Sequence, residues 1–409
     1  MVISLTSIAP ERAVRELASD ARVRRAFRFF EEQSDDINEE HARICSIPAP
    51  PFGEQARAEH LRRKFIECGL TDARIDAAGN CVALRRGSME RPVLVLSAHL
   101  DTVFPSGTDC AVHREMSGRM RAPGIADDGC GLAALLALAR ALEECEIRTR
   151  GSLLFVGTVG EEGEGDLRGV RHLLTKGEWK GRTDAFISID GPGLERVTNA
   201  ALASRRYRVR CKGTGGHSWG DFGVANPVHA LGRVVARLVA YPAPKQPRTT
   251  FNVGRIEGGT GVNVIPRAAG MDVDLRSESM EELARLDAFF RRAAREAAED
   301  ENAARRADTP PLELEVRLIG DRPGGATSPD DALVRLALEA TRALGFRPFL
   351  DCSSTDSNIA ISRRLPAVTI GAGGSSGSTH TLEEWYDPRG RDLGLKRALL
   401  VALGMVGMA

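Results

Sequence analysis

The sequence carries no excess of charge of either sign. Its 409 residues include 56 lysines and arginines and 56 aspartates and glutamates, so the formal net charge is zero. A protein that binds nucleic acid or an anionic membrane surface through its overall charge normally has a basic excess. We therefore expect neither a nucleic-acid partner nor a membrane partner.

Cysteine pairs and long apolar segments are also lacking. The eight cysteines form no CxxC pair and no zinc-ribbon spacing, which is typical of scattered, reduced thiols. Residues 1–25 show no basic start followed by an apolar core, and no stretch reads as a membrane span. We therefore expect no signal peptide, no transmembrane helix and a cytoplasmic location.

The hydrophobic pattern predicts an α/β domain that is interrupted by a second domain. Four apolar runs are typical of buried strands in a parallel sheet, at residues 93–98, 152–159, 185–189 and 366–370. The segment 204–320 instead follows the order β-α-β-β-α-β of a ferredoxin-like domain. We predict a mixed, mostly parallel sheet covered by helices, formed by residues 1–203 and 321–409, with 204–320 inserted. Residues 103–121 are expected to form a loop.

Polar side chains follow three of the apolar runs. His99 and Asp101 end the first, Glu161 and Glu162 follow the second, and Asp190 follows the third. The carboxyl ends of parallel strands face one crevice of an open α/β sheet, so these groups should meet there. So many carboxylates at one edge would repel one another unless cations lie between them.

Two further segments add to this set. Asp127 and Asp128 open an apolar helix; N-capping and the helix dipole account for one of these acids, but not for both. His380 follows the last predicted strand. Histidine and carboxylate ligands without thiolate suit zinc, cobalt or manganese, and five positions exceed the needs of one tetrahedral ion. The sequence therefore predicts two divalent metal ions held by His99, Asp127, Glu162, Asp190 and His380.

Two metal ions are a known device for hydrolysis, because together they activate water and polarise a carbonyl group. Glu161 would accept the proton of the water and pass it to a leaving nitrogen. Asp101 would hold His99 in one tautomer and leave its other nitrogen free for a metal. A polar strand end without function, or a structural site for one metal, are alternative interpretations of the same residues.

Five motifs resemble, in order and over nearly the whole chain, those of a zinc-dependent exopeptidase and deacylase family. That family includes peptidase T, glutamate carboxypeptidase, acetylornithine deacetylase and aminoacylase; the matching segments are SAHLDTV, GIADDGCG, VGEEGEG, ISIDG and GSTHTLEEW. The resemblance implies that Asp127 bridges two metals, with His99 and Asp190 completing one site and Glu162 and His380 the other. It also implies a cis peptide bond after Asp127.

The inserted segment resembles the lid and dimerisation domain of the same family. By this resemblance His217, in GTGGHSWGDFGVANP, would enter the site of the partner subunit and help to hold the developing oxyanion. Asn263 and Arg276 would bind a carbonyl or carboxylate group of the substrate. From the residues alone, His217 reads as a turn residue, and Arg276 equally as a surface arginine paired with Asp274 or Glu278.

The resemblance implies a homodimeric di-metal hydrolase that cleaves a peptide bond next to a free terminus. The motifs GIADDG and HTLEEW favour the peptidase T and glutamate carboxypeptidase branches of the family. An N-acyl amino acid deacylase is the alternative, and a non-catalytic binding protein on the same scaffold is a further one. Two departures bear on substrate choice: Gly129 stands where most peptidase-like relatives have a lysine, and the loop 353–358 is richer in serine.

Overall fold

The computed structural model describes residues 9–409, which form two compact units. Of these residues, the sheet unit comprises 9–201 and Ala326–Ala409, and the inserted unit comprises Leu202–Gly325. Residues 1–8, on which the expectation of no signal peptide partly rests, lie outside the described residues. None of the helices in residues 9–409 has the length and apolar character that a membrane crossing requires.

The sheet unit is built on one mixed sheet in the order β1-β2-β6-β3-β7-β17-β8-β15, with β16 also paired to β8. The strands are β1 (Arg74–Ile75), β2 (Cys81–Arg85), β3 (Val93–His99), β6 (Ser152–Thr158), β7 (Ala185–Ile189), β8 (Arg196–Ala201), β15 (Gly325–Ala326), β16 (Phe349–Ser353) and β17 (Ala367–Ile370). The four central strands β6, β3, β7 and β17 run parallel to one another. This arrangement confirms the predicted fold class.

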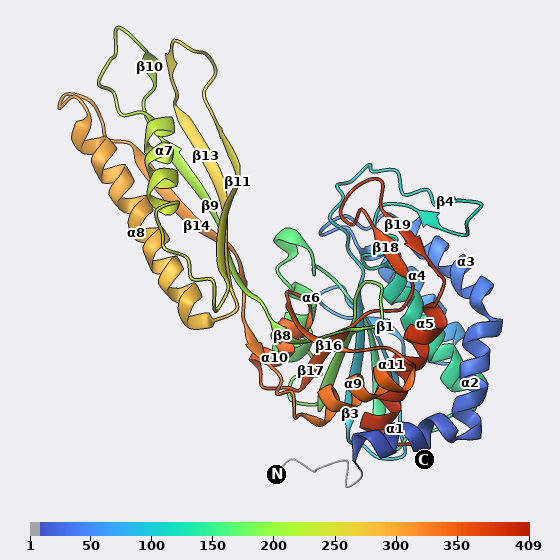
Figure 1. Ribbon diagram of the computed structural model, residues 1–409. Helices are drawn as coiled ribbons and strands as arrows, with labels where there is room; N and C mark the ends of the chain where they lie inside the picture. The colour runs from blue at the N-terminus through green and yellow to red at the C-terminus, as the bar shows by residue number, and fades with distance from the viewer. Residues whose placement is uncertain (1–8) are drawn as a thin grey trace. The chain divides into compact units, whose positions relative to one another are not determined.

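Helices cover both faces of this sheet (Figure 1). They are α1 (Pro10–Ser19), α2 (Ala21–Glu32), α3 (Ser34–Cys45), α4 (Gln55–Glu67), α5 (Gly129–Glu144), α6 (Arg168–Thr175), α9 (Ala332–Ala343), α10 (Ser357–Ser362) and α11 (Arg391–Val406), with a 3₁₀ turn at Gly163–Gly165. Alternate residues of β3 enter different cores: Leu94 and Leu96 pack with α5 and α11, whereas Val93 and Val95 pack with α6 and α10. Because both faces are covered, β3 reads as an unbroken apolar run.

A small antiparallel sheet lies beside the main one, in the order β18-β19-β5-β4. Its strands are β4 (His113–Arg114), β5 (Met120–Arg121), β18 (Ser375–Gly377) and β19 (Trp385–Asp387). The expectation of a loop at 103–121 was therefore wrong at β4 and β5. Strands of two or three residues show no readable period, and here they form through pairing between distant segments.

The inserted unit is a four-stranded antiparallel sheet in the order β11-β13-β9-β14, with α7 and α8 on one face (Figure 1). Its main elements are β9 (Ala203–Lys212), α7 (Pro227–Leu238), β11 (Thr249–Gly258), β13 (Ala268–Ser277), α8 (Met280–Ala304) and β14 (Glu313–Arg322). Alternate residues of β13, such as Met271, Val273 and Leu275, are buried under the helices. Two short strands, β10 (Gly216–His217) and β12 (Val264–Ile265), pair outside this sheet.

Candidate metal centre

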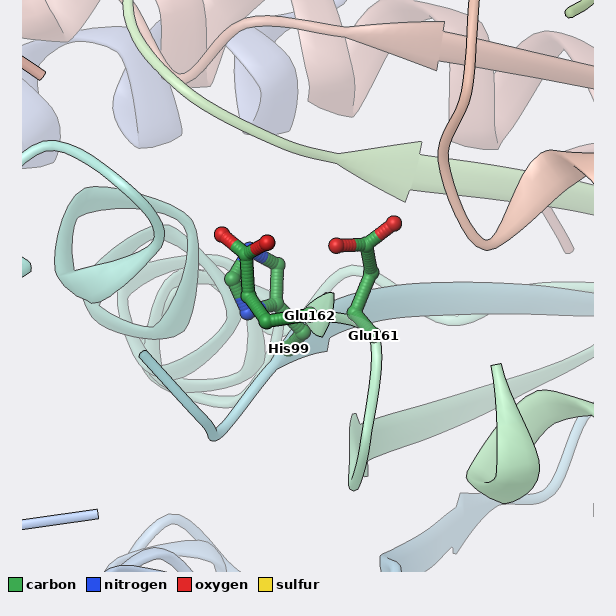
Figure 2. Close-up of side chains that lie close together, drawn as sticks. All are labelled: His99, Glu161 and Glu162. Carbon is green, nitrogen blue, oxygen red and sulfur yellow. The ribbon is translucent and has the colours of Figure 1, made fainter. Parts of the chain in front are cut away.

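The five predicted ligands come from five separate segments of the sheet unit. His99 is the last residue of β3, Glu162 follows the end of β6, and Asp190 follows β7. Asp127 lies in the loop before α5, and His380 lies between β18 and β19. Figure 2 shows that the carboxylates of Glu161 and Glu162 point to the same side, with Glu162 beside the His99 ring. The carboxyl edge of the sheet thus gathers these groups, as strand geometry predicts.

Asp127 lies between the two histidines and turns one carboxylate oxygen to each. Its Oδ1 is 2.8 Å from His99 Nε2, and its Oδ2 is 3.0 Å from His380 Nε2. His380 Nε2 is also 3.0 Å from Glu162 Oε1. In a tetrahedral zinc site with bonds of about 2.0–2.1 Å, ligand atoms lie about 3.3 Å apart. The observed spacings are hydrogen-bond distances that are about 0.3–0.5 Å shorter, so these atoms would need to move apart only slightly to hold a small cation.

Two groups of potential ligands share Asp127. His99, Asp127 and Asp190 form one group, and Asp127, Glu162 and His380 form the other; within each, the ligand atoms lie within 4.8 Å of one another. Glu161 joins His99 and Glu162 in a third group of the same compactness. Because one carboxylate oxygen of Asp127 faces each histidine, the residues fit two metal ions with Asp127 between them.

The carboxylates of this cluster favour the protonated forms of its two histidines. Hydrogen bonds to Asp127 and Glu162 raise the pKa of His380 to about 10. Burial favours the neutral form of His99, but the nearby carboxylate of Asp101 and the hydrogen bond to Asp127 outweigh it and raise the pKa of this histidine well above its usual range. Burial and the neighbouring charge of Asp127 raise the pKa of Asp190 to about 7. Positive charge is thus favoured between the carboxylates, which is where a metal ion would bind.

Asp101 lies beside His99, but it contacts the ring through its backbone carbonyl rather than through the expected carboxylate. His99 Nδ1 lies 2.9 Å from the backbone carbonyl of Asp101 and 3.7 Å from its carboxylate. The carboxylate instead accepts hydrogen bonds from the backbone N–H groups of Glu161 and Glu162, at 3.0 and 2.8 Å. The carbonyl can therefore fix the tautomer of His99 and leave Nε2 free, while the carboxylate positions the Glu161–Glu162 turn.

N-capping was expected to account for one of the two acids, Asp127 and Asp128, and Asp128 is the one that caps α5. Its buried carboxylate accepts hydrogen bonds from the N–H groups of Gly131, in the first turn of α5, and of His99 and Gly191. The Asp127–Asp128 peptide bond is cis, as the resemblance predicts. Asp127 thus faces the cluster, whereas Asp128 ties together the segments that carry His99 and Asp190.

This packing makes Gly131 sensitive to a single added methyl group. A Cβ atom at Gly131 would collide with the Asp128 carboxylate and the carbonyl of Ile189. We expect Gly131→Ala to lower the free energy of unfolding by about 1–3 kcal/mol, as overpacking does. The control is Gly232→Ala on the exposed face of α7, where no atom lies within 4 Å. That change should raise stability by about 0.5–1 kcal/mol. Denaturant unfolding measures both; equal effects would contradict the prediction.

Sequence reasoning missed Glu384, which lies four residues after His380. Its buried carboxylate accepts hydrogen bonds from the N–H groups of Ala126, Asp127, Gly124 and His380, at 2.7, 3.1, 3.3 and 3.3 Å. In the sequence, Glu384 follows Glu383, and two adjacent glutamates are normally interpreted as exposed to solvent. The one available signal was its place within the HTLEEW motif.

The three predicted substrate-binding residues lie in the inserted unit. His217 is exposed, and its Nδ1 accepts hydrogen bonds from the N–H groups of Trp219 and Gly220, as in a turn. Asn263 is exposed on the neighbouring segment, and its carbonyl accepts a hydrogen bond from Ser218. Arg276 is paired with Asp274 at 2.5 Å, which is the surface-pair alternative considered for it.

The sequence matches the model of "Peptidase family M20/M25/M40" over residues 95–402, which is most of the chain. The chain belongs to this family. Membership confirms the resemblance drawn from the five motifs, and it makes this M20 family protein a metal-dependent hydrolase.

Two curated relatives of this M20 family protein differ in the share of the chain that they match. The "Uncharacterized protein YqjE" of Bacillus subtilis (strain 168) is 26% identical over 355 residues, which are 82% of this chain and 89% of that protein. A "Succinyl-diaminopimelate desuccinylase" of Leptothrix cholodnii is 30% identical over 226 residues, 51% of this chain. That match spans 57% of the length of the desuccinylase.

Solved structures share the fold over nearly the whole chain. The aminopeptidase PepT from Bacillus cereus has a TM-score of 0.71 at 20% identity, covering 91% of this chain and 98% of its own. The YXEP protein of Bacillus subtilis, described as a dinuclear metal binding peptidase from the M20 family, has a TM-score of 0.66 at 17% identity. The aligned region covers 93% of this chain and 100% of the YXEP chain. At these identities the likeness concerns the fold of the M20 family protein.

Proposed function

We propose that this protein is a di-metal exopeptidase that cleaves a peptide bond next to a free terminus. The observation that carries the proposal is the placement of Asp127, whose two carboxylate oxygens face His99 and His380 separately. His99 and Asp190 would complete one metal site, and Glu162 and His380 the other. The names of two structural neighbours, an aminopeptidase and a dinuclear metal binding peptidase, support this choice.

The two metals, Glu161 and Asp101 would have separate roles in hydrolysis. When bound, the two ions would supply Lewis-acid activation of a water molecule and of the scissile carbonyl. Glu161 would act as the general base, taking a proton from the water and delivering it to the leaving nitrogen. Its side chain is largely buried beside the metal ligands, and the carboxylate of Asp101 holds its backbone N–H. This position beside the proposed ligands supports a role for Glu161 in proton transfer.

The alternative function is N-acyl amino acid deacylation, which uses the same hydrolytic centre on a different amide. It is favoured by the desuccinylase relative at 30% identity. The further alternative, a binding protein without activity, would be expected to lack a ligand or the general base. All five ligands and Glu161 are present here, which argues against it.

We also propose zinc as the metal, with cobalt or manganese as alternatives, since the ligands are histidines and carboxylates without thiolate. None of the eight cysteines, all of which lie in residues 9–409, forms a disulfide bond, which is compatible with a cytoplasmic location. A homodimer would form through the inserted unit, where β11 is an edge strand with Ile256 exposed. His217 and Asn263 would then bind substrate, and Arg276 would do so after releasing Asp274.

Hydrolysis of a small substrate panel by zinc- or cobalt-loaded protein tests the proposal. The panel contains di- and tripeptides, N-acetyl and N-succinyl amino acids and acyl-glutamates, each with and without a chelator. We expect peptide cleavage that the chelator abolishes and added metal restores. Metal counting accompanies the assay: two ions per chain support the enzyme, one supports a structural site, and none contradicts the proposal. Cleavage of N-acyl substrates alone would select the deacylase.

A further inference from the structure

Glu384 joins two loops that are distant in the sequence. Its Oε1 accepts the N–H groups of Ala126 and Asp127, and its Oε2 accepts those of Gly124 and His380. Asp127 and His380 are 253 residues apart in the chain. One carboxylate thus holds the backbone on both sides of the Asp127–His380 contact.

The pairing of β5 with β19 brings the two loops together at Glu384. Strand β5 pairs with β19 through Arg121–Trp385 and Met120–Tyr386, so the two loops leave the small sheet side by side. The carbonyl of Glu384 also accepts the N–H of Ala122 at 3.2 Å. Beyond that point the loops have left the strand ladder, and the carboxylate supplies the acceptors for their N–H groups.

The loop conformations explain why an acceptor is needed there. Gly124 and His380 both have positive φ, at 73° and 66°. A non-glycine residue in this region is strained, and it persists only where its surroundings fix it. A buried N–H group without an acceptor is also costly. An ionised carboxylate offers about four lone-pair positions, which matches the four N–H groups that Glu384 accepts.

We propose that Glu384 is a positioning residue of the metal centre: it couples the Asp127 loop to the His380 loop and thereby sets the geometry of the Asp127–Glu162–His380 site. The inference rests on the proposed two-metal function. Asp101 and Asp128 act similarly on other segments, since Asp101 holds the Glu161–Glu162 turn and Asp128 holds the N–H groups of His99 and Gly191. Glu384 fixes the remaining ligand, His380, which comes from the C-terminal part of the sheet unit.

The test replaces Glu384 with glutamine and measures metal affinity. Glutamine has nearly the same shape, but its NH₂ group cannot accept, so two of the four N–H groups lose their acceptor. We expect the affinity of the Asp127–Glu162–His380 site to fall about 10–100-fold, the usual effect of removing a residue that orients metal ligands. The His99–Asp127–Asp190 site should weaken less, because Asp127 is the one member of that group that Glu384 contacts, whereas it contacts both Asp127 and His380 in the other group. Zinc titration against a competing chelator, with metal counting, resolves the two sites.

Two further variants make the result interpretable. Glu383→Gln is the matched control, because Glu383 is the exposed neighbour and the same chemical change is made one residue away. Glu384→Asp keeps the charge but shortens the reach by one methylene, and it carries the test if the glutamine variant does not fold. We expect Glu383→Gln to bind metal as the wild type does, and Glu384→Asp to weaken mainly the Asp127–Glu162–His380 site.

A second measurement separates positioning from general stability. If Glu384 acts on metal geometry, raising the zinc concentration should restore the activity of Glu384→Gln, whereas a damaged fold would not respond. Equal weakening of both metal sites, unchanged affinities, or activity that zinc does not restore would each overturn the inference. A wild-type protein that binds two metals alongside an unaffected variant overturns the inference alone. A wild-type protein that binds none overturns the proposed function and the inference with it.

Discussion

Glu161→Gln should lower kcat by about 10²–10⁴-fold while both metal ions stay bound. The size follows from losing a general base that is aligned with its proton. Metal binding should survive because Glu162, not Glu161, lies 3.0 Å from His380. Glutamine also preserves the backbone N–H that Asp101 accepts, so the turn should keep its shape.

The measurement is steady-state kinetics on the best substrate of the panel, with metal content determined on the same samples. Glu164→Gln is the control, since Glu164 lies three residues further on and is exposed. It should retain nearly full activity. If Glu161→Gln keeps more than about a tenth of the wild-type kcat, Glu161 is not the general base. Loss of metal from this variant would instead make Glu161 a ligand.

Asp127→Ala should have the largest effect on metal content, because it removes a proposed ligand from both sites at once. One oxygen of Asp127 faces His99 and the other faces His380, so neither group keeps its full set. We expect less than one ion per chain at metal concentrations that saturate the wild type. We also expect loss of the metal-dependent rise in thermal stability, since only a bound ligand stabilises the folded state.

Asp190→Ala is the matched comparison, because Asp190 belongs to one of the two groups. It should leave about one ion per chain and part of the metal-dependent rise in the unfolding temperature. Metal analysis after dialysis, together with thermal unfolding with and without zinc, checks both variants. Equal metal content in the two variants would show that Asp127 does not bridge.

The central strands of the sheet unit could be predicted because strands that are buried on both faces consist of apolar residues in sequence. Strands β3, β6 and β7 are buried along their whole length, so they appear as uninterrupted apolar runs. Polar residues directly after such runs are conspicuous, and parallel strands bring their carboxyl ends together. His99, the glutamate pair and Asp190 could therefore be found without any structure.

The rest depends on contacts that sequence spacing does not encode. The HTLEEW motif does not show that Glu384 is buried, because its four partners are backbone N–H groups of two remote loops. Strands β4, β5, β18 and β19 are too short to carry a period. For Asp101, the residue was predictable but the atom was not, since the choice between carbonyl and carboxylate depends on how β3 ends.

The separation of His380 from the other proposed ligands means that the residues of the centre are synthesised at different times during translation. His99, Asp127, Glu162 and Asp190 precede the inserted unit, whereas His380 follows it. At about 5–20 residues per second, a ribosome needs about 10–40 s to travel from Asp190 to His380. During that interval all residues of the His99–Asp127–Asp190 group have been synthesised, whereas the Asp127–Glu162–His380 group still lacks His380. The enzyme is thus completed by its C-terminal segment, after the inserted unit has been synthesised.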